Sequence, residues 1–258
     1  MRKLIFFLII ISFSFNSFGQ SKKKQRQMDK RDRIDSLIKQ EEEGVIVYRK
    51  SFVFGAKLIS DGYGMFFELG RASSVKKSIL YQLEISERKN VREEKSNSFY
   101  SNTNPFIYGK ENFFYPVKLG LQQQIVLGNK SNKNGVSITA NYGGGISAGL
   151  LRPYYVQVQQ GNGIGFIKYS QDSTDFLNAK IYGGPNFGKG WSDLTVVPGV
   201  YAKTALRFDY GAYNEIISAI EVGITGDYYT KKIPLMVQNP QRQFFFSGYV
   251  AILFGKRK

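Results

Sequence analysis

Apolar and polar residues alternate at a period of two along most of this chain. The run 136–148 shows the alternation most clearly, because one phase is apolar and the other holds small polar residues and glycine. Since successive side chains of a β-strand point to opposite faces, this pattern predicts a two-faced strand. The apolar phase is Val136, Ile138, Ala140, Tyr142, Ile146 and Ala148, and the polar phase is Ser137, Thr139, Asn141, Gly143, Gly145 and Ser147.

Similar alternation recurs along the chain and predicts about eight strands. The runs span residues 45–60, 63–70, 78–86, 112–128, 136–148, 196–209, 216–227 and 243–255. In the last run Phe244, Phe246, Val250, Ile252 and Phe254 share one face, so aromatic residues lie near both ends of that strand. A phase nearly free of charge and bounded by aromatics is typical of a wall that faces lipid. We therefore predict an all-β fold, an antiparallel up-and-down transmembrane β-barrel of about eight strands over residues 45–258.

The connections between these runs differ in length in a regular way. The odd-numbered connections, which we place outside the cell, are the tight hairpin turn at Asp61-Gly62, the polar stretch 87–111, the irregular stretch 151–194 and the loop 230–242. The alternate connections, near Ser73, Asn132 and Gly211, are short. Short periplasmic turns and long external loops are the usual asymmetry of outer-membrane barrels, so we place the short turns in the periplasm.

The region 151–194 and the residue Pro116 allow two further predictions. The region 151–194 contains the segments YYVQVQ and GIGFIKYS, which predict a hairpin that extends the barrel outside the membrane. Pro116 lies inside a predicted strand and cannot donate a ladder hydrogen bond. We expect it near the rim of the barrel or at a bulge.

The N-terminal residues carry an export pattern. Arg2 and Lys3 precede the apolar run 4–11, and small and polar residues follow it, which predicts a signal peptide over residues 1–19. The apolar run is too short for a helical membrane anchor. Residues 20–44 are dense in both charges and predict a periplasmic tether or short helix, with a docking helix for a partner as the alternative. The predicted location is the outer membrane of a Gram-negative cell.

The inward phase of the predicted strands collects charges of both signs. An unpaired buried charge is costly, and an eight-stranded barrel is only wide enough for side chains to fill. We therefore predict a salt-bridged polar core without an open channel, and keep a narrow pore or relay as the alternative. The members of this predicted lumen charge network are Arg49, Lys57, Glu68, Glu84, Lys118, Lys203, Arg207, Glu221 and Asp227.

The composition excludes several kinds of catalytic and metal-binding site. The chain has no histidine and no cysteine, which excludes Ser-His hydrolysis, cysteine catalysis and histidine-based zinc sites. The segment GGPNFGK at 183–189 has phosphate-loop spacing, but Gly190 replaces the serine or threonine that binds magnesium, and no strand-to-helix context surrounds it. We expect no catalytic residue, cofactor site or metal site.

The net charge of +16 favours contact with anionic surfaces. The phosphates of lipopolysaccharide are the expected ones for an exported chain, and the export signal argues against nucleic acid. Expected partners are therefore outer-membrane lipid, lipopolysaccharide and envelope or secretion-system proteins. We expect the barrel itself to be a monomer.

The closing strand that ends near Phe254, the exported N-terminus and the alternating runs together resemble small outer-membrane β-barrel proteins of the Bacteroidota type. The FGQ after the apolar run and the segments LEISERKNVREEK and ANYGGGISAGLLRPYY are similar to that group, which is PorT-like and OmpX-like in architecture. The group includes secretion accessory barrels, such as the type IX secretion protein PorT. Outer-membrane lipid A deacylases share the architecture, but no residue here carries their Ser-His chemistry.

These observations favour a non-enzymatic outer-membrane barrel with a structural, envelope-assembly or secretion-accessory role. One alternative is a narrow solute channel. The other is a soluble exported barrel that binds a lipid, whose interior should be apolar and whose exterior should be polar.

Overall fold

The computed structural model describes residues 49–74, 76–97, 104–130, 135–160, 163–169, 180–211, 215–237 and 239–258. The predicted signal peptide, the predicted tether and the start of the first predicted strand, at 45–48, lie outside the described residues. Within the described part of the chain, no helix is both long and apolar enough to cross a membrane.

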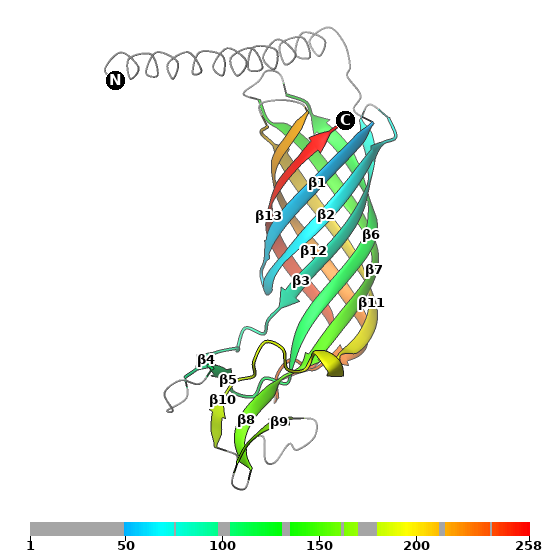
Figure 1. Cartoon of the computed structure of the whole chain (residues 1–258). Helices are drawn as coiled ribbons and strands as arrows, with labels where there is room; N and C mark the ends of the chain where they lie inside the picture. The colour runs from blue at the N-terminus through cyan, green and yellow to red at the C-terminus, as the bar shows by residue number, and fades with distance from the viewer. Residues whose placement is uncertain are drawn as a thin grey trace, which may run out of the picture. The chain divides into compact units, whose positions relative to one another are not determined.

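Eight antiparallel strands form a closed barrel in which each strand pairs with its neighbours along the chain and the first pairs with the last (Figure 1). The predicted all-β, eight-stranded up-and-down barrel is therefore confirmed. The strands are β1 (Lys50–Ile59), β2 (Gly62–Ala72), β3 (Lys77–Arg88), β6 (Asn112–Gly128), β7 (Ser137–Pro153), β11 (Thr195–Asp209), β12 (Ile216–Ile233) and β13 (Arg242–Arg257).

The faces of the strands alternate as the sequence predicts. In β13, Phe244, Phe246, Val250, Ile252 and Phe254 are exposed, at 48–65% of their surface, and the residues between them are mostly buried. The same exposed apolar phase recurs around the barrel, for example in Leu58, Met65, Leu83, Leu119, Ile146, Val200 and Val222. The outer wall is therefore apolar.

The two ends of the barrel differ. One end, which we call the turn end, holds the short connections β2–β3, β6–β7 and β11–β12. The other end, which we call the loop end, holds the β1–β2 hairpin turn and the three longer connections. This asymmetry agrees with the sequence prediction. The wall is also taller on one side toward the loop end, because β12 has 18 residues and β1 has 10.

The connection after β7 forms the hairpin that the sequence predicts. Strands β8 (Tyr155–Gln160) and β9 (Gly163–Lys168) pair in register, and β10 (Ile181–Gly183) adds to the other edge of β8. A short helix, η1 (Trp191–Asp193), and the strand pair β4 (Lys95–Ser96) and β5 (Phe106–Ile107) complete the loop end. The buried members of the small core here are Ile107, Tyr154, Val156, Val158 and Ile167.

An apolar layer fills the interior of the barrel at the loop end. The segment 234–237 crosses toward β6, where Glu111 N–H donates to the Leu235 carbonyl at 2.9 Å and Val237 N–H donates to the Gly109 carbonyl at 2.8 Å. Side chains from five barrel strands and from Leu235 pack beside this segment, with aromatic rings in contact. They are Phe114, Leu151, Val197, Tyr229, Ile233, Leu235 and Phe245.

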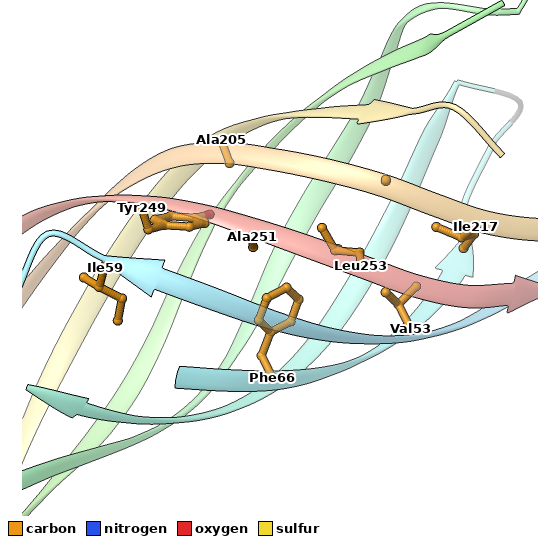
Figure 2. Packing of buried hydrophobic residues seen from close by; sticks show 9 residues of the cluster. Val53, Ile59, Phe66, Ala205, Ile217, Tyr249, Ala251 and Leu253 are labelled. Atoms are coloured by element: carbon orange, nitrogen blue, oxygen red, sulfur yellow. The ribbon is translucent and has the colours of Figure 1, made fainter. Parts of the chain in front are cut away.

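A second apolar cluster lies inside the wall formed by β1, β2, β11, β12 and β13 (Figure 2). The ring of Phe66 covers Gly55, where a Cβ atom would stand 2.4 Å from the Phe66 Cζ. Glycine at this position lets the ring lie against the backbone. The cluster holds Val53, Ile59, Phe66, Ala205, Ile217, Ala219, Tyr249, Ala251 and Leu253.

Pro116 lies in β6 near the loop end, where the β3–β6 pairing has no partner for it between Ile85↔Val117 and Arg88↔Phe114. This placement fits the expected position near the rim.

Candidate functional site

The candidate site is the lumen charge network. Eight of its nine predicted members are buried, with 0–5% of their surface exposed: Lys57, Glu68, Glu84, Lys118, Lys203, Arg207, Glu221 and Asp227.

Arg49 is the exception and corrects the prediction. Its side chain is exposed, and the residue precedes β1. Its phase along the strand is the inward one, but the barrel wall ends beside it at the turn end. Period two gives the face of a residue and not the height at which the lumen opens to solvent.

The first group of contacts centres on Arg207 and Glu221. Arg207 of β11 donates to Glu68 of β2 at 2.7 and 3.0 Å, and to Glu221 of β12 at 2.6 and 2.8 Å. Because β11 and β2 occupy opposite positions in the eight-strand order, the Arg207–Glu68 pair spans the lumen. Glu221 also accepts hydrogen bonds from Lys203 at 3.2 Å, Tyr249 at 2.7 Å and Asn141 at 3.0 Å.

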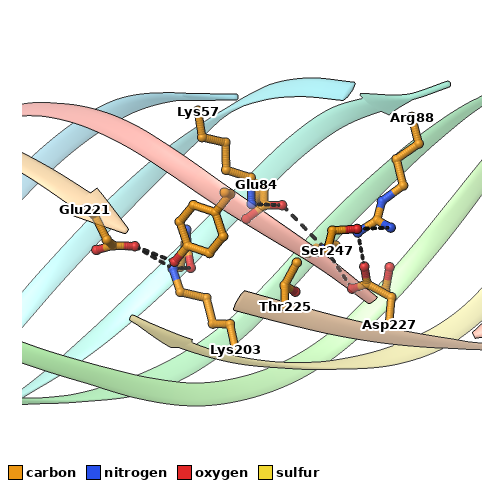
Figure 3. Close-up of polar contacts among 12 residues, drawn as sticks. Lys57, Glu84, Arg88, Lys203, Glu221, Thr225, Asp227 and Ser247 are labelled. Atoms are coloured by element: carbon orange, nitrogen blue, oxygen red, sulfur yellow. Dashed lines mark hydrogen bonds and ion pairs between the residues drawn. The ribbon is translucent and has the colours of Figure 1, made fainter. Parts of the chain in front are cut away.

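The second group lies next to the first in the lumen (Figure 3). Lys203 of the first group also donates to Gln82 at 3.1 Å, and Gln82 accepts a further hydrogen bond from Gln122. Lys57 pairs with Glu84 at 2.5 Å, and Lys118 lies 2.7 Å from Asp227 and 3.5 Å from Glu84. Figure 3 shows Asp227 lying beside Arg88 and Ser247, away from Glu221.

Arg88 was missed by the sequence analysis, which placed it in the loop 87–111. In the structure β3 runs on to Arg88, whose guanidinium donates to Asp227, to Ser247 at 3.2 Å and to Asp61 at 3.0 Å. The signal was present, because the inward phase of β3 continues from Glu84 through positions 86 and 88. Asp61 was missed for another reason. The sequence identifies Asp61-Gly62 as a turn, but it does not show that the Asp61 side chain points toward Arg88 in the lumen.

The network is balanced in charge among the described residues. The side chains are nearly all desolvated, so each charge depends on its partners for stabilisation. A buried ion pair is close to neutral for stability, whereas a single buried charge without a partner costs several kcal/mol. The five cations are Lys57, Arg88, Lys118, Lys203 and Arg207, and the five carboxylates are Asp61, Glu68, Glu84, Glu221 and Asp227.

Aromatic rings and neutral polar groups complete the filling of the lumen. The Lys57 Nζ lies 4.8 Å from the centroid of the Tyr249 ring, and the Lys118 Nζ lies 5.2 Å from that of Tyr201. Among the described residues, several buried polar atoms find no hydrogen-bond partner in the protein, including Tyr201 Oη, Gln82 Nε2 and Gln122 Oε1. Ordered water satisfies groups of this kind in folded proteins.

A separate cluster attaches the loop-end elements to the barrel. Arg152 of β7 is 3% exposed, and its guanidinium carbon lies 4.1 Å from the Phe113 ring centroid and 4.8 Å from that of Trp191. It donates to the Phe187 carbonyl at 2.9 Å, and the Trp191 indole donates to the same carbonyl at 2.8 Å. The cation thus holds η1 and its preceding turn against β6 and β7.

Lys110 and Glu111 lie at the loop end, directly before β6. Lys110 is 1% exposed, and its Nζ lies 2.5 Å from the Glu93 carboxylate. Burial lowers the pKa of Lys110, and the Glu93 carboxylate opposes that shift. Burial raises the pKa of Glu111, which has no ion pair with another described residue.

The loop end also carries a cleft of about 250 Å³. It opens between the β1–β2 turn, the segment after β3 and the segment before β13. Its charged lining is mostly cationic and consists of Lys89, Arg92, Arg242 and Asp61. Within the described residues, no group of three or more acidic side chains is placed to hold a metal ion.

Comparisons with solved structures found eight similar chains, including the three that follow. The N-terminal β-barrel domain of OprF from Pseudomonas aeruginosa is 9% identical with a TM-score of 0.36, covering 80% of this chain and 97% of that chain. Neisserial surface protein A (NspA) is 10% identical with a TM-score of 0.37, covering 81% and 96%. Ail, the attachment invasion locus protein of Yersinia pestis, is 7% identical with a TM-score of 0.37, covering 82% and 100%. Similarity this distant carries no argument about function. No protein-family model and no curated protein matches the chain.

Proposed function

We propose that the protein is an integral outer-membrane β-barrel with a structural or interaction role. The observation that carries the proposal is the distribution of polarity in the closed barrel. Large apolar side chains are 40–72% exposed on the outer wall, whereas the charged groups point inward. Lipid is the solvent that such a wall requires, and a closed barrel leaves no strand edge unpaired within it.

The contents of the lumen favour a closed barrel over a solute channel. The network bridges opposite walls through Arg207 and Glu68, and the apolar layer with Phe114, Tyr229 and Leu235 occupies the loop end. An eight-stranded barrel has room inside for side chains alone. The alternative of a soluble lipid-binding barrel needs an apolar interior and a polar exterior, and the observed faces are the reverse.

The loop end is the part of the molecule suited to partners. Its small sheet and the cleft lined by Lys89, Arg92 and Arg242 stand beyond the apolar wall. Cations at this end suit the phosphates of lipopolysaccharide in the outer leaflet. The resemblance to Bacteroidota-type barrels, PorT among them, supports an accessory role in secretion or envelope assembly, exercised through this end.

The proposal is tested by fractionating cells and comparing boiled with unboiled samples on a gel. We expect the protein in the outer-membrane fraction, with a mobility that changes on boiling as the folded barrel opens. Recovery in the soluble periplasmic fraction would overturn the membrane assignment. Planar-bilayer recording of the purified barrel tests the closed lumen separately: steady single-channel conductance would replace the structural role with the channel.

A further inference from the structure

Three cations lie side by side in one cross-strand row on the outer wall at the turn end. Lys50 and Lys258 exchange two backbone hydrogen bonds, each of 2.8 Å, and Lys50 is the register partner of Arg71 on its other side. All three side chains are exposed and belong to the outward phase. Directly opposite residues of an antiparallel sheet have Cβ atoms about 5 Å apart, so the three charges are close neighbours.

Among the described residues, no acidic side chain belongs to this row. Like charges placed directly opposite each other destabilise a sheet. Lys256, two positions from Lys258 on the same face, adds a fourth cation. Of the described acidic residues at this rim, Asp209 is already bound by Lys130 and Arg257 at 3.5 and 2.5 Å. Glu215 lies opposite Arg257, on the inward phase of the sheet and not on the face of the row. An anion from outside the described chain would remove the repulsion.

The wall next to the row is apolar and aromatic. The adjacent row on the same face pairs Phe52 with Leu69 on one side and with Lys256 on the other. The row after it pairs Phe54 with Phe67 and with Phe254. The Phe52 and Phe67 rings are in edge contact at 4.6 Å, and Phe52 is 54% exposed. Same-face rows are about 7 Å apart along a strand, so cations and apolar wall adjoin as headgroup and acyl chain do in a lipid.

We propose that the row of Lys258, Lys50 and Arg71 binds the phosphate of an anionic glycerophospholipid, whose acyl chain lies along the wall formed by Phe52, Phe54 and Phe254. The inference rests on the proposed function, because it needs the barrel in a membrane. The ligand is a glycerophospholipid and not lipid A, because the short turns of such barrels face the periplasm and the membrane leaflet on that side holds glycerophospholipid.

The test is native mass spectrometry of the full chain, purified in detergent and titrated with phosphatidylglycerol, phosphatidylcholine or lipid A. We expect the wild-type protein to retain phosphatidylglycerol in preference to the other two lipids. The variant K50Q/R71Q/K258Q should lose that preference by roughly a hundredfold, from about fivefold per cation at a membrane surface. The matched control K95Q/K231Q/K232Q removes three exposed cations from the loop end and should bind as the wild type does.

Each other result overturns the inference. Equal losses in both triple variants would mean attraction by net charge alone, and a preference for lipid A would assign the row to the other leaflet. A third result would be that the wild type binds no lipid whereas the variant E41Q/E42Q/E43Q does. The anion that the row binds would then be the acidic run at 41–43 of the chain itself. The gel mobility shift on boiling is recorded for every variant. A folded barrel in the outer-membrane fraction without lipid retention therefore defeats this inference alone.

Discussion

Arg88 of β3 donates a hydrogen bond to the carboxylate of Asp227 on β12, the strand at the opposite position of the barrel. The two residues are 139 positions apart in the chain and both side chains are fully buried. A contact between opposite walls forms only when the whole cylinder has closed. The contact between Arg88 and Asp227 therefore exists only in the closed barrel.

Replacing Arg88 by methionine should lower the free energy of unfolding by about 3–5 kcal/mol. The change leaves the buried Asp227 carboxylate with Lys118 as its remaining cation and removes the contact to Asp61, and a buried charge that loses its partner is costly. Urea unfolding of the folded barrel in lipid vesicles measures the loss.

A double-mutant cycle provides the control for this prediction. The variant R88M/D227N removes both charges and should be more stable than the sum of the two single changes implies. Strict additivity would show that the two groups do not stabilise each other.

The sequence could predict the fold and most of the network because the period-two signal is strong wherever one wall faces an apolar medium. It located β6 at its observed bounds, Asn112–Gly128, and assigned both faces of β13 correctly. The failures at Arg49 and Arg88 share a cause. Alternation tells which way a side chain points, but the ends of strands are set by the height of the neighbouring wall.

The pairing inside the lumen could not be read from the sequence. Arg207 meets Glu68 because strands β11 and β2 stand opposite each other at a stagger that brings the two residues to one height. That stagger belongs to the closed barrel as a whole and not to either strand. Asp61 shows the same limit, since a residue in a tight turn enters the lumen only because β1 is short.

Gly55 should tolerate no larger side chain. A Cβ atom there would meet the Phe66 ring at 2.4 Å, so G55V should destabilise the barrel by about 1–3 kcal/mol through overpacking. The control is G248V, at a glycine with open space around the position of its Cβ atom, which should unfold close to the wild-type midpoint. Adding F66A to G55V should recover part of the loss, and equal effects of G55V and G248V would contradict the proposed contact.

Arg152 should hold the loop-end elements without being needed for the barrel. R152A removes the contacts of the guanidinium with the Phe113 and Trp191 rings, each worth about 0.5–2 kcal/mol. Amide hydrogen exchange in residues 181–193 should then accelerate at least about tenfold, whereas the gel mobility shift on boiling should remain.

R152K provides the comparison for this prediction. It keeps the charge but loses the planar group that stacks on the rings and donates to the Phe187 carbonyl. It should therefore resemble R152A more than the wild type. Full protection of residues 181–193 in R152K would show that charge alone holds the cluster.

Glu111 should make the loop end less stable at neutral pH than in mild acid. Burial raises the pKa of its carboxyl in the folded state above the ordinary value of 4.5. Between pH 4.5 and the folded-state pKa, the folded state therefore binds more protons than the unfolded state does. Stability is therefore lost as pH rises from 4.5 through the folded pKa. E111Q should stabilise the loop end at pH 7 by less than about 1 kcal/mol, because the side chain is only partly buried, and should show no gain below pH 4.5. Hydrogen exchange at the Glu111 and Val237 amides, corrected for intrinsic rates, measures this, with the exposed E94Q as control. An equal gain from E94Q, or a gain from E111Q that persists at low pH, would show that burial of the Glu111 carboxylate is not the cause.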